Sequence, residues 1–364
     1  MRPSHAAPHP AGRTRIAHGP EAGPRTPISS EVRISGPSAI LLAMTARFLL
    51  HIGANKTGTS SIQRMLVDNT AALARAGWTY PDVHLMHCAH HALAYALAGH
   101  PTRGLPDGWR GAWAQATADP SQRVVISSEL FFRNVPPRAA ATLFPPGQTR
   151  IVLYLRDHLS YMASWYAQAV QERNLTASFD DYIRLFPQAF DTFLKSWEAV
   201  YGAEAITLRP FRRDAFADGD IRADFLAQMG GIDGITMPKA DSNLTISGNL
   251  LFFKRLLNHV MSYEEAHSHP IPDEFGAYAE LRDTFRGRFE TGPDTATLVS
   301  QVFARDRADL MARGLDLGPV PPHVTGHPCP NYDTLQSDVA LIAQVAEDTN
   351  KTFLPYARRL PVWP

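Results

Sequence analysis

The stretch HIGANKTGTSSIQ, residues 51–63, contains two glycines in the spacing of a nucleotide-binding loop. A P-loop has a Gly, four further residues and then Gly-Lys-Ser/Thr. Gly53 and Gly58 keep this spacing, but Thr59 stands where the lysine belongs, and the lysine lies upstream at Lys56. A glycine-rich turn that enters a helix directs backbone N–H groups and the positive end of the helix dipole at one point. The stretch therefore predicts an anion site and leaves open which phosphate compound occupies it.

Short apolar runs alternate with helical patterns along most of the chain. The runs that indicate strands are 47–52, 77–81, 123–128, 150–155 and 205–211, and helical patterns follow at 90–99, 136–143, 159–170, 190–202 and 220–229. From about residue 246 onward only helical patterns occur. Strands that alternate with helices indicate a parallel sheet with helices on both faces. We therefore predict an α/β fold with a P-loop-like parallel central sheet flanked by helices and a helical C-terminal part.

Three chemically suitable side chains follow the predicted strands. Lys56 lies in the loop after the first strand, and Glu129 and Arg156 follow the strands at 123–128 and 150–155. In open parallel sheets, ligands bind beyond the carboxyl ends of the strands. We expect these three side chains to meet at that edge.

Bulk charge and cysteine content restrict the classes of partner. Lys plus Arg and Asp plus Glu both total 35, so no net field favours nucleic acid or an anionic membrane. The apolar stretch 38–50 is too short for a bilayer span and is interrupted by Arg47. Cys88 and Cys329 form neither a CxxC pair nor a disulfide scaffold. We expect a cytoplasmic protein with no nucleic-acid partner and no integral membrane segment; the sequence does not indicate an oligomeric state.

The N-terminal residues differ in composition from the rest. Residues 1–37 hold seven prolines, four glycines and no Phe, Trp or Tyr, so they cannot bury enough apolar surface to offset the ordering entropy. We expect residues 1–45 to be a disordered extension and 46–364 to be a single domain with a helical region from about 246. A signal peptide is the alternative, but no small-residue cleavage site precedes the first strand. Met44 is an alternative start.

The segment NKTGTSS, residues 55–61, resembles the loop of sulfotransferases that binds the 5′-phosphosulfate of 3′-phosphoadenosine 5′-phosphosulfate (PAPS), which reads like PKSGTTW. The resemblance implies that Lys56 is the catalytic lysine. It also implies that four successive residues surround the 5′-phosphate: Thr57, Gly58, Thr59 and Ser60.

A second hallmark of that family is an Arg at a strand end with a Ser eight residues later, which together bind the 3′-phosphate. LRDHLSYMAS, residues 155–164, supplies Arg156 and Ser164 at this spacing. The resemblance covers roughly residues 47–260 and is closest to bacterial sulfotransferases that modify carbohydrates.

Two features depart from the family. The glycine-rich RKG segment of the soluble aryl and steroid enzymes is missing, so the 3′-phosphate needs further partners elsewhere. Their histidine base is also absent, and the corresponding strand end reads SSELFF at 127–132. Sugar-directed relatives often place a glutamate there, which makes Glu129 the candidate base, with His90 or His91 in reserve. Glu129 could instead be an ion-pair partner of a basic residue: Arg123, Arg133 or Lys56.

The implied activity is transfer of a sulfuryl group from PAPS to a hydroxyl or amine of an acceptor, with a small molecule or glycan as acceptor and no required metal. No Walker B strand ending in Asp follows, since the candidate strands end in VVISSE and IVLYLR. One alternative is a P-loop kinase or NTPase with an atypical loop, which needs such an Asp. Another is a catalytically inactive relative that only binds.

Several residues also have structural interpretations. Lys56 could be a solvated loop lysine, Arg156 could pair with a carboxylate, and Ser164 could hydrogen-bond within its own helix. The stretch HLMHCAHH, residues 84–91, has spacings that zinc accepts, but zinc usually needs a second ligand set. We predict no metal site there.

Arg209 and Phe211, at the end of the last strand, could touch the adenine or the acceptor, or be structural. The segments 250–259 and 285–290, rich in aromatic residues and arginines, are expected to cover the acceptor cleft.

Overall fold

The computed structural model describes residues 46–238, 245–267 and 271–364. The expected N-terminal extension, residues 1–45, and the alternative start at Met44 lie outside the described residues.

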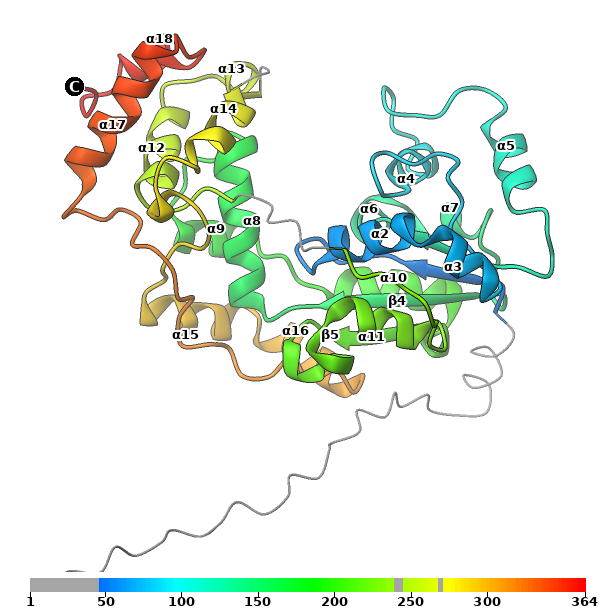
Figure 1. The fold of residues 1–364 in the computed structure, drawn as a ribbon. Helices are drawn as coiled ribbons and strands as arrows, with labels where there is room; N and C mark the ends of the chain where they lie inside the picture. Colours follow the sequence, from blue (N-terminus) through cyan, green and yellow to red (C-terminus); the bar gives the residue numbers. More distant parts are fainter. Residues whose placement is uncertain (1–45, 239–244, 268–270) are drawn as a thin grey trace, which may run out of the picture. The chain divides into compact units, whose positions relative to one another are not determined.

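A five-stranded parallel sheet forms the centre of the α/β part (Figure 1). Its strands are β1 (Phe48–His51), β2 (Trp78–Thr79), β3 (Arg123–Ser127), β4 (Thr149–Leu155) and β5 (Ile206–Pro210), in the order β2-β3-β1-β4-β5. Every adjacent pair is parallel. The predicted α/β class is confirmed: four of the five strands lie within the runs that the apolar pattern selected, and β4 begins one residue before its run, at Thr149.

Helices cover both faces of the sheet, which explains why the strands read as continuous apolar runs. Leu49 and Val125 point to one face, and Leu50 and Ile126 point to the other. The first face packs on α2 (Thr59–Asp68), α3 (Thr70–Arg75) and α11 (Ile221–Gln228). The second packs on α4 (His91–Leu97), α5 (Trp109–Ala116), α6 (Leu130–Asn134), α7 (Pro137–Ala140) and α10 (Asp191–Tyr201).

Helix α8 (His158–Glu172) connects the end of β4 to the helical C-terminal part (Figure 1). Its predicted apolar stripe is buried: Leu159, Met162, Ala163, Tyr166 and Val170. The stripe packs with the helices α9 (Phe179–Leu185), α12 (Gly248–Asn258), α13 (Tyr263–His267), α14 (Ile271–Tyr278), α15 (Pro293–Val302), α17 (Leu335–Asp348) and α18 (Leu354–Ala357). Helix α16 (Ala304–Ala312) instead contributes to the core on the second face of the sheet, the face of Leu50 and Ile126.

Short 3₁₀ turns complete the secondary structure: Ala203–Ala205, Arg213–Ala215, Ala217–Gly219 and Asp283–Phe285. After β5, the described residues form isolated bridges but no further strand, as the sequence predicts.

A buried lysine joins α12 to the C-terminal end of α8. The Lys254 ammonium donates to the Val170 carbonyl oxygen at 3.1 Å and to the side-chain oxygen of Asn258. The Asn258 amide donates to the same Val170 carbonyl and to that of Leu175, each at 2.9 Å. Burial lowers the pKa of Lys254 to about 7. Lys254 is therefore part of the helical core, and the expectation that residues 250–259 cover the acceptor is wrong for this side chain.

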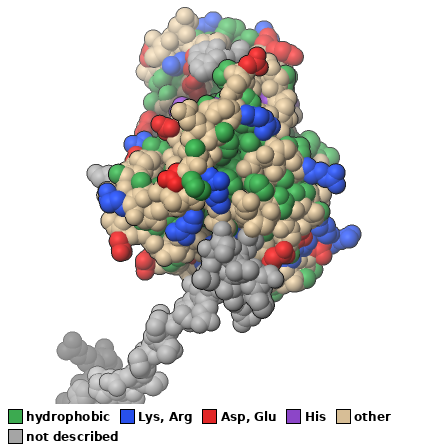
Figure 2. Space-filling model, turned by 90° about the vertical axis from the view of Figure 1, so that its right-hand side faces the viewer, with side chains coloured by type: hydrophobic (Ala, Val, Ile, Leu, Met, Phe, Trp, Pro, Cys, Tyr) green, Lys and Arg blue, Asp and Glu red, His purple; other side chains and the backbone are tan. Residues whose placement is uncertain are grey.

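The remaining surface features are unexceptional. On the face drawn in Figure 2, basic and acidic side chains are interspersed among uncharged ones. Both cysteines are free. Over the described part of the chain, every helix is too short or too polar to traverse a lipid bilayer.

Candidate functional site

The loop after β1 is held against β4 by its backbone. The amide of Ala54 donates to the Tyr154 carbonyl at 2.9 Å, and the amide of Tyr154 donates to the Gly53 carbonyl at 2.8 Å. Within the loop, the hydroxyl of Thr57 donates to the Ala54 carbonyl at 2.6 Å. The Thr57 side chain therefore closes the loop, and only its backbone N–H remains for the anion-binding role predicted for it.

Gly58 marks the change from loop to helix. It precedes α2 with φ of 71°, a left-handed conformation that glycine adopts without strain. A Cβ at this position would lie 3.2 Å from the ring of Phe211, so the loop packs directly on that ring. No described side chain caps the start of α2, which leaves its first N–H groups open toward the loop. Thr59 is buried at this helix end and Ser60 is exposed.

Lys56 is half-buried in the loop and lies in the electrostatic field of two carboxylates, neither of which is within ion-pair distance of its ammonium. Burial lowers the pKa of its ammonium, and the negative charges of Glu172 and Glu129 partly offset that effect. Glu129 follows β3, as predicted, whereas Glu172 is the last residue of α8. Lys56 is therefore not the isolated, solvated lysine of the structural alternative.

The carboxylate of Glu129 lies between α2 and α4 and is hydrogen-bonded to α2. Gln63 of α2 donates its amide N–H to one carboxylate oxygen at 2.8 Å. His91, at the start of α4, places Nε2 3.8 Å from the other oxygen, and its Nδ1 lies 2.8 Å from the Ser128 hydroxyl. Glu129 stays 17% exposed and His91 23% exposed. A Cβ on Gly53 would come within 3.0 Å of the Glu129 Cβ, which explains why glycine occupies position 53.

Two of the three basic residues considered as ion-pair partners of Glu129 do not pair with it. The guanidinium of Arg123 lies 4.3 Å above the Trp78 ring, and that of Arg133 lies 4.3 Å above the Phe193 ring. Neither pairs with Glu129, so Lys56 is the remaining cation of the three that acts on it.

The neighbouring histidines have different environments. His90 is fully buried, donates from Nε2 to the Pro81 carbonyl at 2.9 Å and accepts at Nδ1 from the Ser127 amide. Burial lowers the pKa of His90 to about 3, so its ring is neutral and inaccessible. The reserve assignment of His90 as base is therefore wrong. For His91, burial lowers the pKa and the charge of Glu129 partly offsets this. Among the described residues, no group of three His, Cys, Asp or Glu side chains is arranged to hold a metal ion.

Arg156 lies beside the loop and beside Ser164. Its Nη1 is 3.2 Å from the Ser164 hydroxyl and 3.5 Å from the Lys56 carbonyl oxygen, and its guanidinium lies 5.6 Å from the centre of the Phe211 ring. Burial, and to a smaller degree the nearby charge of Arg288, lower the pKa of Arg156 to about 10. The adjacent Asp157 caps α8 through the Ser160 amide. Arg156 thus forms no ion pair with a carboxylate of the described chain.

The contacts of Ser164 agree both with a hydrogen bond inside its own helix and with a place beside Arg156. Its hydroxyl donates to the Ser160 carbonyl one turn earlier at 2.9 Å, and its oxygen accepts from Arg156. The helical hydrogen bond fixes the hydroxyl next to the guanidinium.

The two candidate residues at the end of β5 have different roles. Arg209 pairs with Asp224, with Nε 3.1 Å from the carboxylate, and the Tyr154 hydroxyl donates to the same carboxylate at 2.7 Å. Arg209 is structural. Phe211, in contrast, lies against both Gly58 and Arg156 and belongs to the site.

We call the group Lys56, Glu129, Arg156 and Ser164 the strand-end site. Three further side chains belong to its surroundings: Gln63, Glu172 and Arg288. Gln63 and Glu172 were not predicted, and Arg288 belongs to the segment 285–290 that was expected to cover the acceptor cleft. Gln63 lies one turn into α2 on its buried side, and this position beside a glycine loop is the one sequence signal that could have identified it. Glu172 and Arg288 lie near the site because of the way the helical part packs, and neither follows a strand end.

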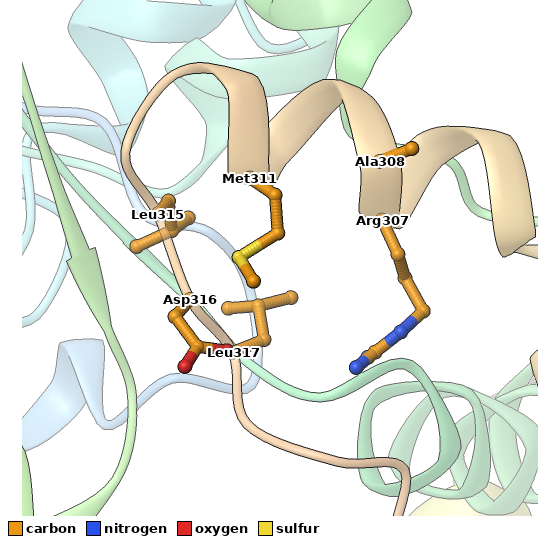
Figure 3. A pocket seen from close by; sticks show the side chains of 6 residues that line it. All are labelled: Arg307, Ala308, Met311, Leu315, Asp316 and Leu317. Carbon is orange, nitrogen blue, oxygen red and sulfur yellow. The ribbon is translucent and has the colours of Figure 1, made fainter.

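A cavity of about 140 Å³ lies elsewhere, between α16 and the segment that follows it (Figure 3). The side chains of Met311, Leu315 and Leu317 gather around it, and Arg307 extends along its other side (Figure 3). None of its lining residues belongs to the strand-end site.

No protein-family model matches the chain, and no curated protein matches it. Among solved structures, the chain is similar to the crystal structure of a sulfotransferase from Alicyclobacillus acidocaldarius, at 16% identity and a TM-score of 0.41. The alignment covers 75% of this chain and 97% of that one. At this identity and TM-score the similarity carries no argument about activity.

Proposed function

We propose that the protein is a sulfotransferase that moves a sulfuryl group from PAPS to a hydroxyl or amine of a carbohydrate acceptor. One observation carries the proposal: the side chains that follow β1, β3 and β4 converge at one edge of the sheet. There a loop lysine lies in the electrostatic field of the Glu129 carboxylate, and Arg156, which forms no ion pair among the described residues, contacts the carbonyl oxygen of that lysine.

The residues of the strand-end site suit PAPS, a donor that carries a phosphosulfate at its 5′ end and a phosphate at its 3′ end. The open N–H groups at the start of α2 suit the 5′-phosphosulfate, because a helix N-terminus favours negative charge. Arg156 and Ser164 suit the 3′-phosphate, since a half-buried guanidinium without a carboxylate partner can be satisfied by an anionic ligand. The Phe211 ring lies between these two places. When bound, PAPS would supply an activated sulfuryl group.

Lys56 and Glu129 divide the work of the transfer. The bond from sulfur to the acceptor oxygen or nitrogen forms as the bond to the bridging phosphate oxygen breaks. The ammonium of Lys56 offsets the charge that develops on that oxygen, a contribution of about 3–4 kcal/mol for one preorganised group. Glu129 receives the proton that the acceptor loses, for roughly 10²–10⁴-fold in rate. The hydrogen bond from Gln63 holds its carboxylate in place, with His91 3.8 Å from the other oxygen.

The kinase alternative has less support. Phosphoryl transfer in P-loop enzymes uses a metal held by an Asp after a strand and a lysine that follows the second loop glycine. Here Glu129 and Arg156 follow β3 and β4, and Lys56 precedes Gly58. A sulfuryl group carries less negative charge than a phosphoryl group, so we expect no metal requirement. The carbohydrate acceptor rests on the resemblance of the sequence motifs.

A thermal-shift panel tests the donor site. We expect 3′-phosphoadenosine 5′-phosphate to raise the melting temperature without metal, since a ligand at about 100 times its Kd stabilises by about 2.7 kcal/mol. Arg156→Ala should lose most of this shift, and Arg138→Ala, which changes an exposed arginine of α7, should keep it. A response to ATP with Mg²⁺ alone would instead support the kinase. Binding of the bisphosphate without transfer of labelled sulfate from PAPS would indicate an inactive relative.

A further inference from the structure

A buried hydroxyl lies next to the proposed base in the sequence and in space. Ser128 immediately follows β3 and precedes Glu129, and its side chain is fully buried. The Ser128 amide donates to the His51 carbonyl at 3.1 Å, and the Ser128 carbonyl accepts from the Phe131 amide at 3.2 Å. These backbone hydrogen bonds fix Ser128 between the sheet and α6, so its hydroxyl is a permanent neighbour of the strand-end site.

The Ser128 hydroxyl has two hydrogen-bond neighbours. Its oxygen accepts from the Leu130 amide at 3.3 Å and lies 2.8 Å from Nδ1 of His91. A hydroxyl has one hydrogen to donate and two lone pairs that accept. Within the described part of the chain, Nδ1 of His91 is the one hydrogen-bond acceptor found for this hydroxyl. Because buried polar groups are normally satisfied, we assign Ser128 as the donor and Nδ1 as the acceptor.

This assignment places the proton of a neutral His91 on Nε2, the nitrogen that lies 3.8 Å from a carboxylate oxygen of Glu129. In the opposite tautomer, the hydrogen of Ser128 would lack an acceptor, and the lone pair of Nε2 would face a negative charge, which is unfavourable. Burial lowers the pKa of His91, so the ring is neutral at pH 7.5 and carries one proton. Both neighbours of the ring therefore favour the same tautomer.

The two oxygens of Glu129 thus face N–H groups from two helices. Gln63 of α2 donates to one oxygen at 2.8 Å, and His91 of α4 directs Nε2–H at the other from 3.8 Å. The second distance exceeds that of a hydrogen bond, so this oxygen keeps its lone pairs for a further donor. Catalytic hydrogen bonds often tighten only in the complex with substrate. The oxygen near His91 is therefore the one that suits the acceptor's proton.

We propose that His91 is a positioning residue that directs Nε2–H at Glu129, in a tautomer fixed by Ser128, and that His91 does not itself receive the acceptor's proton. This inference rests on the proposed sulfotransferase function, which supplies the role of Glu129. It gives the reserve candidate for the base a role that needs an N–H donor and no change of protonation. The amide of a glutamine should therefore replace the ring.

A pair of variants separates an N–H donor from a base. The rate of labelled-sulfate transfer from PAPS would be measured with water and with chitosan oligosaccharides, which offer hydroxyl and amine groups. His91→Leu should lower turnover roughly 10- to 100-fold, as expected for the loss of one N–H donor to a charged group. His91→Gln should stay within about threefold of the wild type. His87→Asn is the matched control, because His87 is exposed and has a left-handed φ of 56° that Asn tolerates.

The tautomer is measured directly by nuclear magnetic resonance of the full chain with ¹⁵N-labelled histidine at pH 7.5. The signals of His91 are those missing from His91→Gln. We expect a protonated Nε2 and an unprotonated Nδ1. In Ser128→Ala, the Nδ1 signal should move toward the position of a nitrogen that accepts no hydrogen bond, while Nε2 stays protonated.

Three outcomes would overturn the proposal: a proton on Nδ1 in the wild type, equal losses of turnover in His91→Gln and His91→Leu, or unchanged turnover in both. Stabilisation by 3′-phosphoadenosine 5′-phosphate should be the same in all His91 and Ser128 variants, which also shows that they fold. If the bisphosphate does not stabilise the wild type and no sulfate is transferred, the sulfotransferase function fails. The ¹⁵N spectra then still decide whether Ser128 directs Nε2–H at Glu129.

Discussion

At the scale of single residues, Lys56 lies in the field of two carboxylates that differ in how they are held. Glu129 is fixed by Gln63 at 2.8 Å and lies 3.8 Å from His91. Glu172 is exposed at the end of α8, and its described partner is Gln168 of the same helix. A general base must be held within reach of the proton that it accepts. This difference favours Glu129 over Glu172.

The first prediction separates the two carboxylates. Glu129→Gln keeps the shape and the contact with α2 but cannot accept a proton, so turnover should fall by roughly 10²–10⁴-fold. Glu172→Gln, the matched control, should change turnover by less than about threefold, as expected for an exposed charge. Steady-state rates of labelled-sulfate transfer and the thermal shift with the bisphosphate measure both effects. If donor affinity falls in parallel with turnover in Glu129→Gln, the residue is structural.

The second prediction concerns His90, which is neutral in the folded protein. Its folded pKa of about 3 lies below its ordinary value of 6.5, so between these values the unfolded chain binds more protons. The stability that His90 contributes is present above pH 6.5 and is lost as the pH falls. At pH 5 this amounts to about 2 kcal/mol.

Urea unfolding at pH 7 and pH 5 measures this loss. His90→Gln retains a donor and an acceptor in the same pocket but does not titrate there. The wild type should therefore lose about 2 kcal/mol more unfolding free energy than His90→Gln over this interval. Equal losses in the two proteins would show that His90 is already neutral in the unfolded chain or is not buried as described.

The residues that the sequence identified are those whose position follows from a strand end. Lys56, Glu129 and Arg156 each come within a few residues of a buried apolar run, and parallel strands bring such residues to one edge. Glu172 and Arg288 lie far from any strand in the sequence. Their charges act on the site because of helix packing, which periodicity does not specify. His90 and His91 are adjacent in sequence, so only the direction of each side chain distinguishes a buried ring from a site residue.

At the scale of elements, apolar runs predicted the strands well because both faces of the sheet are covered. Helix bounds were less exact. The helix expected at 136–143 is confined to Pro137–Ala140, since the chain continues as turns toward the next strand. The junction between α8 and α12 was not foreseen, because a lysine in LFFKRLLNHV suggests an exposed side chain. Here Lys254 is buried, and a carbonyl and an amide oxygen accept its N–H groups.

The third prediction follows from this junction. The folded pKa of Lys254 is about 7 and its ordinary value is 10.5, so between these values the unfolded chain holds the extra proton. Stability should therefore rise with pH across this window. Relative to Lys254→Met, which cannot titrate, the wild type should gain about 2 kcal/mol of unfolding free energy between pH 7.5 and 9.

Chemical unfolding of both proteins at these two pH values provides the measurement. The comparison with Lys254→Met removes the contribution of tyrosines and other groups that titrate at high pH. Parallel pH profiles for the two proteins would mean that the lysine keeps its ordinary pKa and is solvated in the folded state.

At the scale of the whole molecule, the helical part contributes a cation to a site that is otherwise built on the sheet. Arg288 is exposed, and its neighbour Phe289 packs on α8, with its ring 5.5 Å from that of Tyr166. The Arg288 carbonyl accepts from the His327 amide at 2.8 Å, which ties the segment to the rest of the helical part. Its charge lowers the pKa of Arg156. Two mutually repelling guanidinium groups are stabilised when an anion lies between them.

The fourth prediction is that Arg288 contributes to donor binding. Arg288→Ala should raise the Kd for 3′-phosphoadenosine 5′-phosphate roughly three- to tenfold, as expected for one partly solvated contact with a phosphate. Arg286→Ala is the matched control, because Arg286 lies two residues away but pairs with Glu280 and Asp283. Isothermal titration would be carried out at low salt and at about 0.5 M salt, which screens exposed charges. The difference in Kd between the Arg288→Ala and Arg286→Ala variants should become smaller at the higher salt concentration. Equal affinities for the two variants would mean that the donor's phosphate is held from the sheet side alone, by Arg156 and Ser164.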